Sequence, residues 1–399
     1  MTATEQPAAA PQQPEAESGK RGFSLPSWWE AALFPIIIGL AAIFPFFVDS
    51  GGTVLNTAVL ALAYTVMALG LNIIVGFAGL LDLGYVAFFA IGAYVMGWFG
   101  SLFFSSVNNE KGIHVLVTGP AAELPGIHLN FVLVLVAAII FTTIAGMLIG
   151  LPTLRLRGDY IAIVTLAFGE IIGRIAINGD ELKIAGQPLT AGRQGITPVD
   201  KIDLPFVDPF KSLDLVPWYY VALVLVTLAL FVSFALRNSR LGRAWIALRE
   251  DEVAAVAMGV PAVKTKLLAY GTGAAFGGMA GAFLGSFNNT VNADQFQFYF
   301  SILILGMVIL GGLGSIWGVV LGAVALTVIN FYLLPDVFNN LPSKVGLDFD
   351  TTQITFAIYG FLLLIMMVLR PEGLIPERRR KQELHEGTEG DEPLITARV

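Results

Sequence analysis

Long uncharged apolar stretches recur along most of this chain, and they restrict its fold more than any other feature. Stretches of about 18 or more apolar residues are typical of membrane-spanning helices. The sequence is 56% hydrophobic and 13% charged, with a mean hydropathy of +0.75. These values exclude a soluble two-domain enzyme and predict one all-α integral membrane domain over residues 31–370.

The spacing of the apolar stretches predicts a polytopic bundle of about ten transmembrane helices. The uncharged segment 295–335 is too long for one helix, and the run Gly311-Gly-Leu-Gly314 is the natural place to divide it. The expected helices cover residues 31–48, 54–76, 84–106, 129–151, 159–178, 217–236, 266–288, 297–313, 315–334 and 353–369.

The segments outside the helices are polar. Residues 1–30 form a tail rich in Pro and Ala that we expect to be disordered. No cleavage site follows this tail, so we expect the first apolar helix to stay in the chain. Residues 371–399 form a charged, solvated tail, and residues 179–216 are expected to form an ordered extracytoplasmic loop.

Lys and Arg residues predict the orientation in the membrane, because they concentrate in cytoplasmic loops. With both termini cytoplasmic, sixteen of the 23 basic residues fall on the inner side, six fall outside, and Arg174 lies within a helix. Adding or removing one early helix would place a basic loop on the wrong side. The distribution therefore supports both the helix count and the cytoplasmic termini.

One compact polar segment, residues 237–265, interrupts the apolar pattern on the inner side. Apolar residues that include Trp245 recur there at helical spacing. The acidic residues 250–252 suit the start of a second short helix, and Gly259 followed by Pro261 predicts its end. A helix rich in small residues can enter a groove on a partner protein. The other interpretation is an amphipathic helix on the lipid surface.

Glycines punctuate two apolar helices between Gly70 and Val95. Small residues let helix backbones approach closely in lipid, and they allow a break in a helix that lines a path. Packing alone explains any single glycine. The polar Asn72, together with Gly76 and Gly79, nevertheless makes this segment a candidate for a translocation path.

The segment 154–174 places two ionisable residues inside an expected helix. Asp159 suits the N-cap of this helix, and Glu170 and Arg174 stand at i and i+4 on it. Ionisable groups within a membrane helix are costly and face protein or water. The two residues are either an internally satisfied pair near the outer boundary or the polar lining of a path.

A further helix, expected over 266–288, carries six glycines between residues 271 and 285. Gly277 and Gly281 have the GxxxG spacing that favours close packing of membrane helices. We therefore expect this helix to approach another helix closely. The partner helix can belong to this chain or to a second subunit.

Several chemistries are not indicated. The chain has no Cys and three scattered His, so we expect neither a thiolate site nor a metal cluster. It lacks the Gly-x-x-x-x-Gly-Lys-Ser/Thr phosphate loop and would not hydrolyse ATP itself. We expect no enzyme activity, no cofactor, no metal and no nucleic-acid partner.

The core of the inner polar segment, Glu252-Val-Ala-Ala-Val-Ala-Met-Gly259, resembles the EAA loop of permease subunits of bacterial ATP-driven importers. It departs from the strict pattern because Val253 separates the Glu from the Ala pair. The segments Gly70–Val95 and Leu154–Arg174 resemble the LivM-type permease subunit of the branched-chain amino-acid (LIV) ABC importer family. Together the three segments span roughly residues 70–321.

This resemblance implies a vitamin-importer-like type II permease in the bacterial cytoplasmic membrane. The implied partners are a LivH-type permease, two ABC ATPase subunits, an extracytoplasmic amino-acid binding protein and membrane lipid. The implied substrates are leucine, isoleucine and valine. The residues assigned to ATPase coupling are Arg243, Glu250, Glu252, Ala254, Ala255 and Gly259, and those assigned to a possible translocation path are Asn72, Gly76, Gly79, Glu170 and Arg174.

Other transport functions stay open on the sequence. A urea or short-chain amide ABC importer would use a similar permease. An ion-coupled secondary amino-acid transporter would need carboxylates near the bilayer midplane, where only Glu170 is a candidate, and it would leave the Ala-rich inner segment without a role. A passive channel would transport without ATP.

Overall fold

The structure is a computed structural model that describes residues 27–105, 111–117, 119–153, 160–184, 186–203, 210–211, 213–338, 355–370 and 372–375. It divides into two compact units, Met1–Ala41 and Ala42–Val399. Helix α1 (Ser27–Ile43) provides the described part of the first unit and begins four residues before the expected boundary of the tail. Apart from residues 372–375, the rest of the expected tails, together with Asp159, lies outside the described residues.

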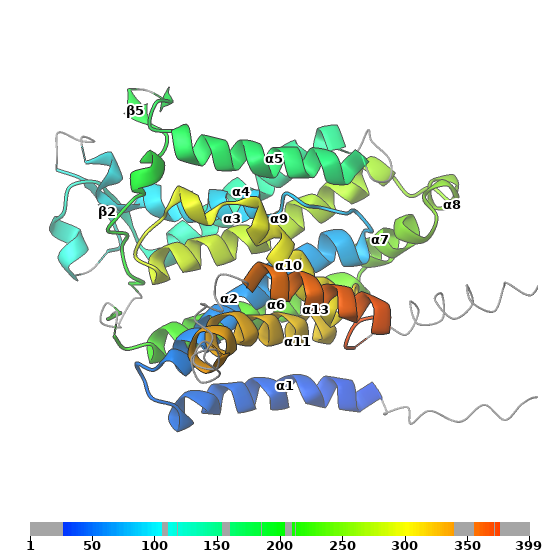
Figure 1. Cartoon of the computed structure of the whole chain (residues 1–399). Coiled ribbons are helices and arrows are strands. Elements are labelled where there is room, and N and C mark those ends of the chain that lie inside the picture. Colours follow the sequence, from blue (N-terminus) through cyan, green and yellow to red (C-terminus); the bar gives the residue numbers. More distant parts are fainter. Residues whose placement is uncertain are drawn as a thin grey trace, which may run out of the picture. The chain divides into compact units, whose positions relative to one another are not determined.

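The second unit is a bundle of helices that run back and forth roughly parallel to one another (Figure 1). Its helices are α2 (Thr53–Leu71), α3 (Val86–Phe99), α4 (Phe131–Thr153), α5 (Tyr160–Asn178), α6 (Val216–Asn238), α7 (Arg240–Glu250), α8 (Glu252–Ala257), α9 (Ala262–Phe287), α10 (Phe298–Gly311), α11 (Ile316–Val328) and α13 (Thr355–Leu369).

The described residues hold twelve α-helices rather than ten, because the inner polar segment adds α7 and α8. Six spans are long and apolar enough to cross a membrane, which is fewer than the ten expected. The helices α3 and α10 are apolar but have only 14 residues each. The six spans are Thr53–Phe77, Phe131–Thr153, Tyr160–Asn178, Val216–Asn238, Ala262–Phe287 and Ile316–Pro335.

The expected division at Gly311–Gly314 is confirmed. α10 ends at Gly311 and α11 begins at Ile316, with Gly312 and Gly314 at φ +115° and +84°. The short segment 372–375 pairs with this break: the Leu374 amide donates to the Leu310 carbonyl at 2.9 Å. This part of the expected solvated tail is therefore held against the bundle.

Helix α9 runs through the interior, and most of it is buried among α2, α3 and α4. A Cβ atom on Gly92 of α3 would lie only 2.5 Å from the Cα of Gly278, and one on Gly281 would lie 2.3 Å from the Phe89 carbonyl oxygen. Glycine is required here because the backbones touch. The expected close packing of this glycine-rich helix is confirmed, and its partners lie within the chain.

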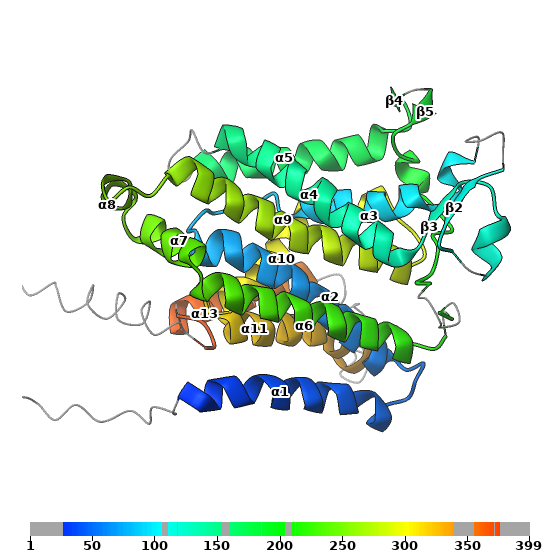
Figure 2. The same cartoon turned by 180° about the vertical axis from the view of Figure 1, so that it is seen from behind.

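The two ends of this bundle differ (Figures 1 and 2). Helices α7 and α8 lie at one end. The other end carries a three-stranded sheet in the order β1 (Gly100–Ser101), β3 (Ile127–Leu129), β2 (Ile113–Val115). The hairpin of β4 (Lys183–Ile184) and β5 (Gln187–Pro188) and a 3₁₀ turn at Gly192–Gln194 show that the long loop expected at 179–216 is ordered where it is described.

Candidate functional site

The polar segment between α6 and α9 folds into two short helices. Ser239 separates α6 from α7, and its Oγ accepts a hydrogen bond from the Gly242 amide at 3.1 Å. Asp251 separates α7 from α8, and its Oδ1 accepts from the amides of Val253 and Ala254 at 2.9 and 3.0 Å. Both residues are N-caps, so each helix start is fixed by its own sequence.

The end of α8 is equally well defined. The Val260 amide donates to the Ala255 carbonyl at 3.0 Å, and the Gly259 amide donates to the Val256 carbonyl at 2.9 Å. Gly259 has φ +92°. These are the two bonds of a Schellman motif with glycine at C′. The expected stop at Gly259 is confirmed, and its reason is the positive φ.

Two contacts attach this segment to the interior helix α9. Trp245 is completely buried, and its indole Nε1 donates to the Thr265 carbonyl at 2.7 Å. The Lys266 ammonium forms an ion pair with Glu252 at 2.7 Å, and the Lys266 side chain is almost fully buried. These two contacts connect α7 and α8 directly to the start of α9.

Helix α8 exposes nearly all of its surface. Val253 is 76% exposed and Met258 is 87% exposed. Ala254 is also exposed, whereas Ala255 is buried against the chain itself. The coupling residues assigned from the sequence thus divide: Arg243, Glu250, Ala254 and Gly259 lie on the exposed side, while Ala255 and the paired Glu252 connect the helix to its own subunit.

Arg249 joins this segment to the end of α2. The α2 helix continues as a π-helix over Asn72–Phe77, and Arg249 Nη1 donates a hydrogen bond to the Gly76 carbonyl there. Gly79 has φ +69°, and a Cβ at that position would lie 2.7 Å from Arg249 Cγ. The sequence did not single out Arg249, because its partner lies 173 positions away.

Asn72 and Gly76, which lie in the same π-helix, both contact the Gly314 backbone. Asn72 is 1% exposed, and its Oδ1 accepts from the Gly314 amide at 2.9 Å. A Cβ on Gly76 would lie 2.7 Å from the same Gly314 nitrogen. These residues connect the π-helix to the break between α10 and α11, so they are interior contacts between helices.

Helix α5 carries opposite charges on its exposed face. Its inner face packs closely, and a Cβ on Gly169 would lie 3.0 Å from the Gly84 Cα. Glu170 and Arg174 lie on the exposed face, and they line a pocket of about 400 Å³. Neither side chain pairs with the other or with any residue that the structure describes. They are brought together as expected, but not as an internally satisfied pair.

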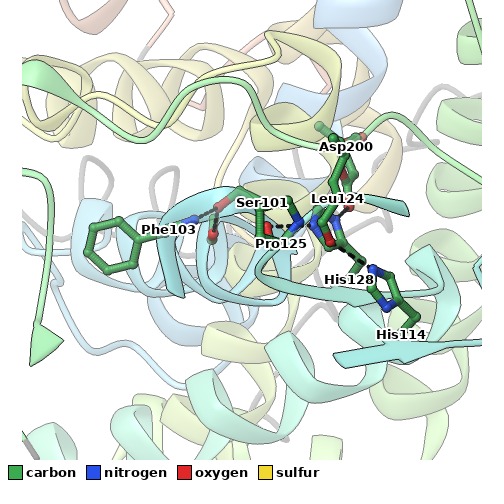
Figure 3. Close-up of polar contacts among 9 residues, drawn as sticks. Ser101, Phe103, His114, Leu124, Pro125, His128 and Asp200 are labelled. Atoms are coloured by element: carbon green, nitrogen blue, oxygen red, sulfur yellow. Dashed lines mark hydrogen bonds and ion pairs between the residues drawn. The ribbon is translucent and has the colours of Figure 1, made fainter. Parts of the chain in front are cut away.

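At the opposite end of the bundle the structure shows a polar cluster that the sequence did not indicate (Figure 3). His128 Nδ1 donates to Asp200 Oδ2 at 2.6 Å. The ring of His114 stacks on that of His128, with centroids 5.4 Å apart, and its Nε2 donates to the Leu124 carbonyl at 2.9 Å. Two of the three apparently scattered His residues therefore meet, because β2 and β3 are neighbouring strands.

The surroundings of His128 favour its protonated form. Burial lowers the pKa of His128, but the hydrogen bond and the negative charge of Asp200, with the Pro125 carbonyl, raise the pKa above its ordinary value of 6.5. The second ring nitrogen, Nε2, lies 3.4 Å from the Pro125 oxygen. Both nitrogens face acceptors, and only the imidazolium donates from both. No group of three metal-binding side chains occurs among the described residues.

A bundle of membrane-length helices, with a capped and exposed two-helix segment attached to its interior helix, is the membrane subunit of a transporter. Residues 53–369 match the family described as the permease component of branched-chain amino acid transport systems. The chain belongs to this family. It is a multi-pass protein of the bacterial inner membrane.

Individual relatives agree with this membership. The chain is 35% identical over 371 residues to the high-affinity branched-chain amino acid transport system permease protein LivM of Salmonella typhimurium, covering 88% of this chain and 76% of the relative. A LivM protein of Escherichia coli matches over the same shares at the same identity. A probable LivM of Methanocaldococcus jannaschii is 27% identical, covering 79% of this chain and 91% of the relative.

More distant similarity extends to other permeases. The Escherichia coli LivH permease is 25% identical over 170 residues, which are 43% of this chain and 49% of LivH. No solved structure matches this chain.

Proposed function

We propose that this chain is the permease subunit of an ATP-driven importer of leucine, isoleucine and valine. Its membership of the permease family and its similarity to LivM proteins support this function. A LivH-type permease would complete the translocation path, two ATPase subunits would supply the energy, and an extracytoplasmic binding protein would deliver the substrate. The chain itself would transport without catalysing a reaction.

The observation that best supports the coupling role is the capped α8 helix. Helix α8 presents exposed Val253 and Ala254, and the residue after it, Met258, is also exposed. A group of exposed apolar side chains is typical of a protein interface. Behind it, Arg249 contacts the π-helical end of α2. In the proposed cycle, ATPase closure moves α7 and α8, and these contacts transmit the movement to α2 and α9.

The membrane orientation belongs to the same proposal. Arg237, Arg240 and Arg243 lie at the α7–α8 end, which favours the cytoplasmic side. The sheet of β1, β3 and β2 is then extracytoplasmic. The shorter helices α3, α10 and α13 would cross with the six longer ones, which gives about ten spans with α1 and places both termini inside.

We assign residues of the possible translocation path to two parts of the molecule, helix α5 and the segment that follows α2. Glu170 and Arg174 on the exposed face of α5 are proposed to line it, facing the second permease. Asn72, Gly76 and Gly79 are proposed to act beside it, as the element whose shape changes when Arg249 moves.

The test is uptake by the complete importer in proteoliposomes, with radiolabelled leucine outside and ATP inside. The proposal predicts uptake that requires ATP and the binding protein, and that excess isoleucine or valine competes away. Competition by urea or acetamide alone would assign the chain to the amide importers. Leucine uptake driven by a proton or sodium gradient without ATP would overturn ATP coupling.

A further inference from the structure

The pocket on α5 has a chemical composition more specific than a polar lining requires. It contains one cation, Arg174, and a carboxylate, Glu170, within about one helical turn, and it is also lined by a second carboxylate, Glu181, and by the amide of Asn178. The apolar side chains that line the pocket are those of Ile171, Ile175 and Leu182. The pocket thus offers opposite charges beside an apolar wall.

The charged side chain of Glu170 lies far from both ends of α5. Glu170 is the eleventh of the 19 residues of α5, so it lies about 15 Å along the axis, near the middle of the helix, at about 1.5 Å per residue. An ionised side chain at that depth is expensive against lipid and is expected to face protein or water. The exposed face of α5 must therefore line an aqueous or protein-bounded space.

The two charges are also available for a ligand. Residues at i and i+4 have Cβ atoms about 5–6 Å apart, yet the side chains of Glu170 and Arg174 form no ion pair with each other or with the other residues described. The small buried residues Gly169 and Ala176 on the opposite face fix the rotation of α5. The helix therefore holds both charged groups toward the same open space.

We propose that this pocket binds the transported amino acid as a zwitterion. The Arg174 guanidinium takes the α-carboxylate, the Glu170 carboxylate takes the α-ammonium group, and Ile171 and Ile175 contact the aliphatic side chain. A planar guanidinium suits a carboxylate because it can donate two parallel hydrogen bonds. This inference rests on the proposed import of amino acids, and it names the groups that recognise them.

The side chains that line the α5 pocket disfavour neutral ligands and metal ions. Urea, short amides and sugars are neutral, so they would bring no opposite charge to either Arg174 or Glu170. A metal ion would need further carboxylate or imidazole ligands, and the described residues contain no group of three such side chains. A zwitterion with an aliphatic side chain satisfies the cation, the carboxylate and the apolar wall together.

The test compares variants of the complete importer in proteoliposomes, measuring leucine uptake and ATP hydrolysis stimulated by the binding protein. Arg174→Gln and Glu170→Gln should each lower uptake roughly tenfold or more, the loss expected for one charge-assisted hydrogen bond. ATP hydrolysis should stay within about twofold, since the coupling segment is unchanged. Arg174→Lys should retain more uptake than Arg174→Gln. Arg193→Gln, an exposed loop arginine outside the pocket, is the matched control.

Three other results would overturn either the zwitterion site or the proposed import function. Unchanged uptake by both Gln variants would overturn the zwitterion site and leave the import function standing. Loss of the second permease from purified Arg174→Gln complexes would show that Arg174 holds an interface, which also overturns the site. Absence of leucine uptake by the wild-type importer would instead reject the proposed function.

Discussion

Arg249 of α7 donates a hydrogen bond to the carbonyl of Gly76, in the π-helix that ends α2. Short π-helical segments are rare and are frequently found at functional sites, and the Gly76 carbonyl in this one accepts a hydrogen bond from outside its own helix. The contact joins the segment proposed to meet the ATPase with a helix that is 83% buried in the bundle.

The first prediction concerns Arg249 itself. Arg249→Ala removes the donor and leaves the Gly76 carbonyl without a partner, at a cost of about 1.5–3 kcal/mol for a hydrogen bond from a charged group. We expect ATP hydrolysis to continue while leucine transported per ATP falls. Arg240→Ala, an exposed arginine on the same helix, should change neither quantity. Equal coupling in the two variants would remove Arg249 from the route.

The second prediction concerns the end of α8. Gly259→Ala places a side chain at φ +92°, where an L-residue is strained by about 1–3 kcal/mol, although no atom lies within 4 Å of the new Cβ. We expect insertion of the subunit to be unchanged and the affinity for the ATPase to fall. Gly259→Arg adds bulk to the exposed surface and should uncouple hydrolysis from uptake. Full uptake by Gly259→Arg would contradict the docking assignment.

A third prediction separates the cap from the surface of α8. Asp251→Ala removes the acceptor of two amide hydrogen bonds and should destabilise the helix start by about 0.5–2 kcal/mol. Asp251→Asn keeps a capping oxygen and should behave like the wild type. Faster amide exchange at Val253 and Ala254 in the Ala variant alone would support the cap, and equal exchange in both variants would refute it.

The fourth prediction concerns the glycine contact between α3 and α9. Gly92→Ala puts a methyl group 2.5 Å from the Gly278 Cα, and overpacking of this kind costs about 1–3 kcal/mol. We expect a lower midpoint of thermal unfolding in detergent. Gly360→Ala, at a helical glycine whose new Cβ meets nothing within 4 Å, should leave the midpoint unchanged. A similar shift in both variants would mean that the α3–α9 contact is not specific.

The fifth prediction is a pH dependence of the sheet end of the bundle. The folded-state pKa of His128 is raised above 6.5, so its contribution is complete below the unfolded pKa and is lost as pH rises through the folded pKa. We expect amide exchange in β2 and β3 to be slower at pH 6 than at pH 8.5, after correction for the intrinsic rate. Asp200→Asn should abolish this difference, and His114→Gln is the control that retains the His128–Asp200 pair. A difference that persists in Asp200→Asn would assign it to another group.

The sequence predicted those features that depend on local pattern. Apolar runs gave the helix positions, the Gly-rich run gave the break between α10 and α11, and Gly259 gave the end of α8. Each depends on residues within a few positions of one another, so a single sequence carries the information. Of the ten expected spans, six have membrane length in the described residues, and α3 and α10 are apolar throughout but have only 14 residues each.

Contacts between distant residues could not be predicted in this way. His128 and Asp200 are 72 positions apart, Asn72 and Gly314 are 242 apart, and no periodicity links them. The π-helix at Asn72–Phe77 was likewise missed, since its apolar residues read as a continuation of α2. Glu170 and Arg174 were recognised as unusual, but whether they paired with each other depended on side-chain geometry.

The burial of α9 has a consequence for how this helix is held in the membrane. Its mean hydropathy of 1.3 is the lowest of the six long spans, against 2.8 for α4, so α9 on its own is a weak signal for insertion into lipid. The helices α2, α3 and α4 that contact it are synthesised earlier. The stability of α9 in the membrane therefore depends on its contacts with these earlier helices more than on its own hydropathy.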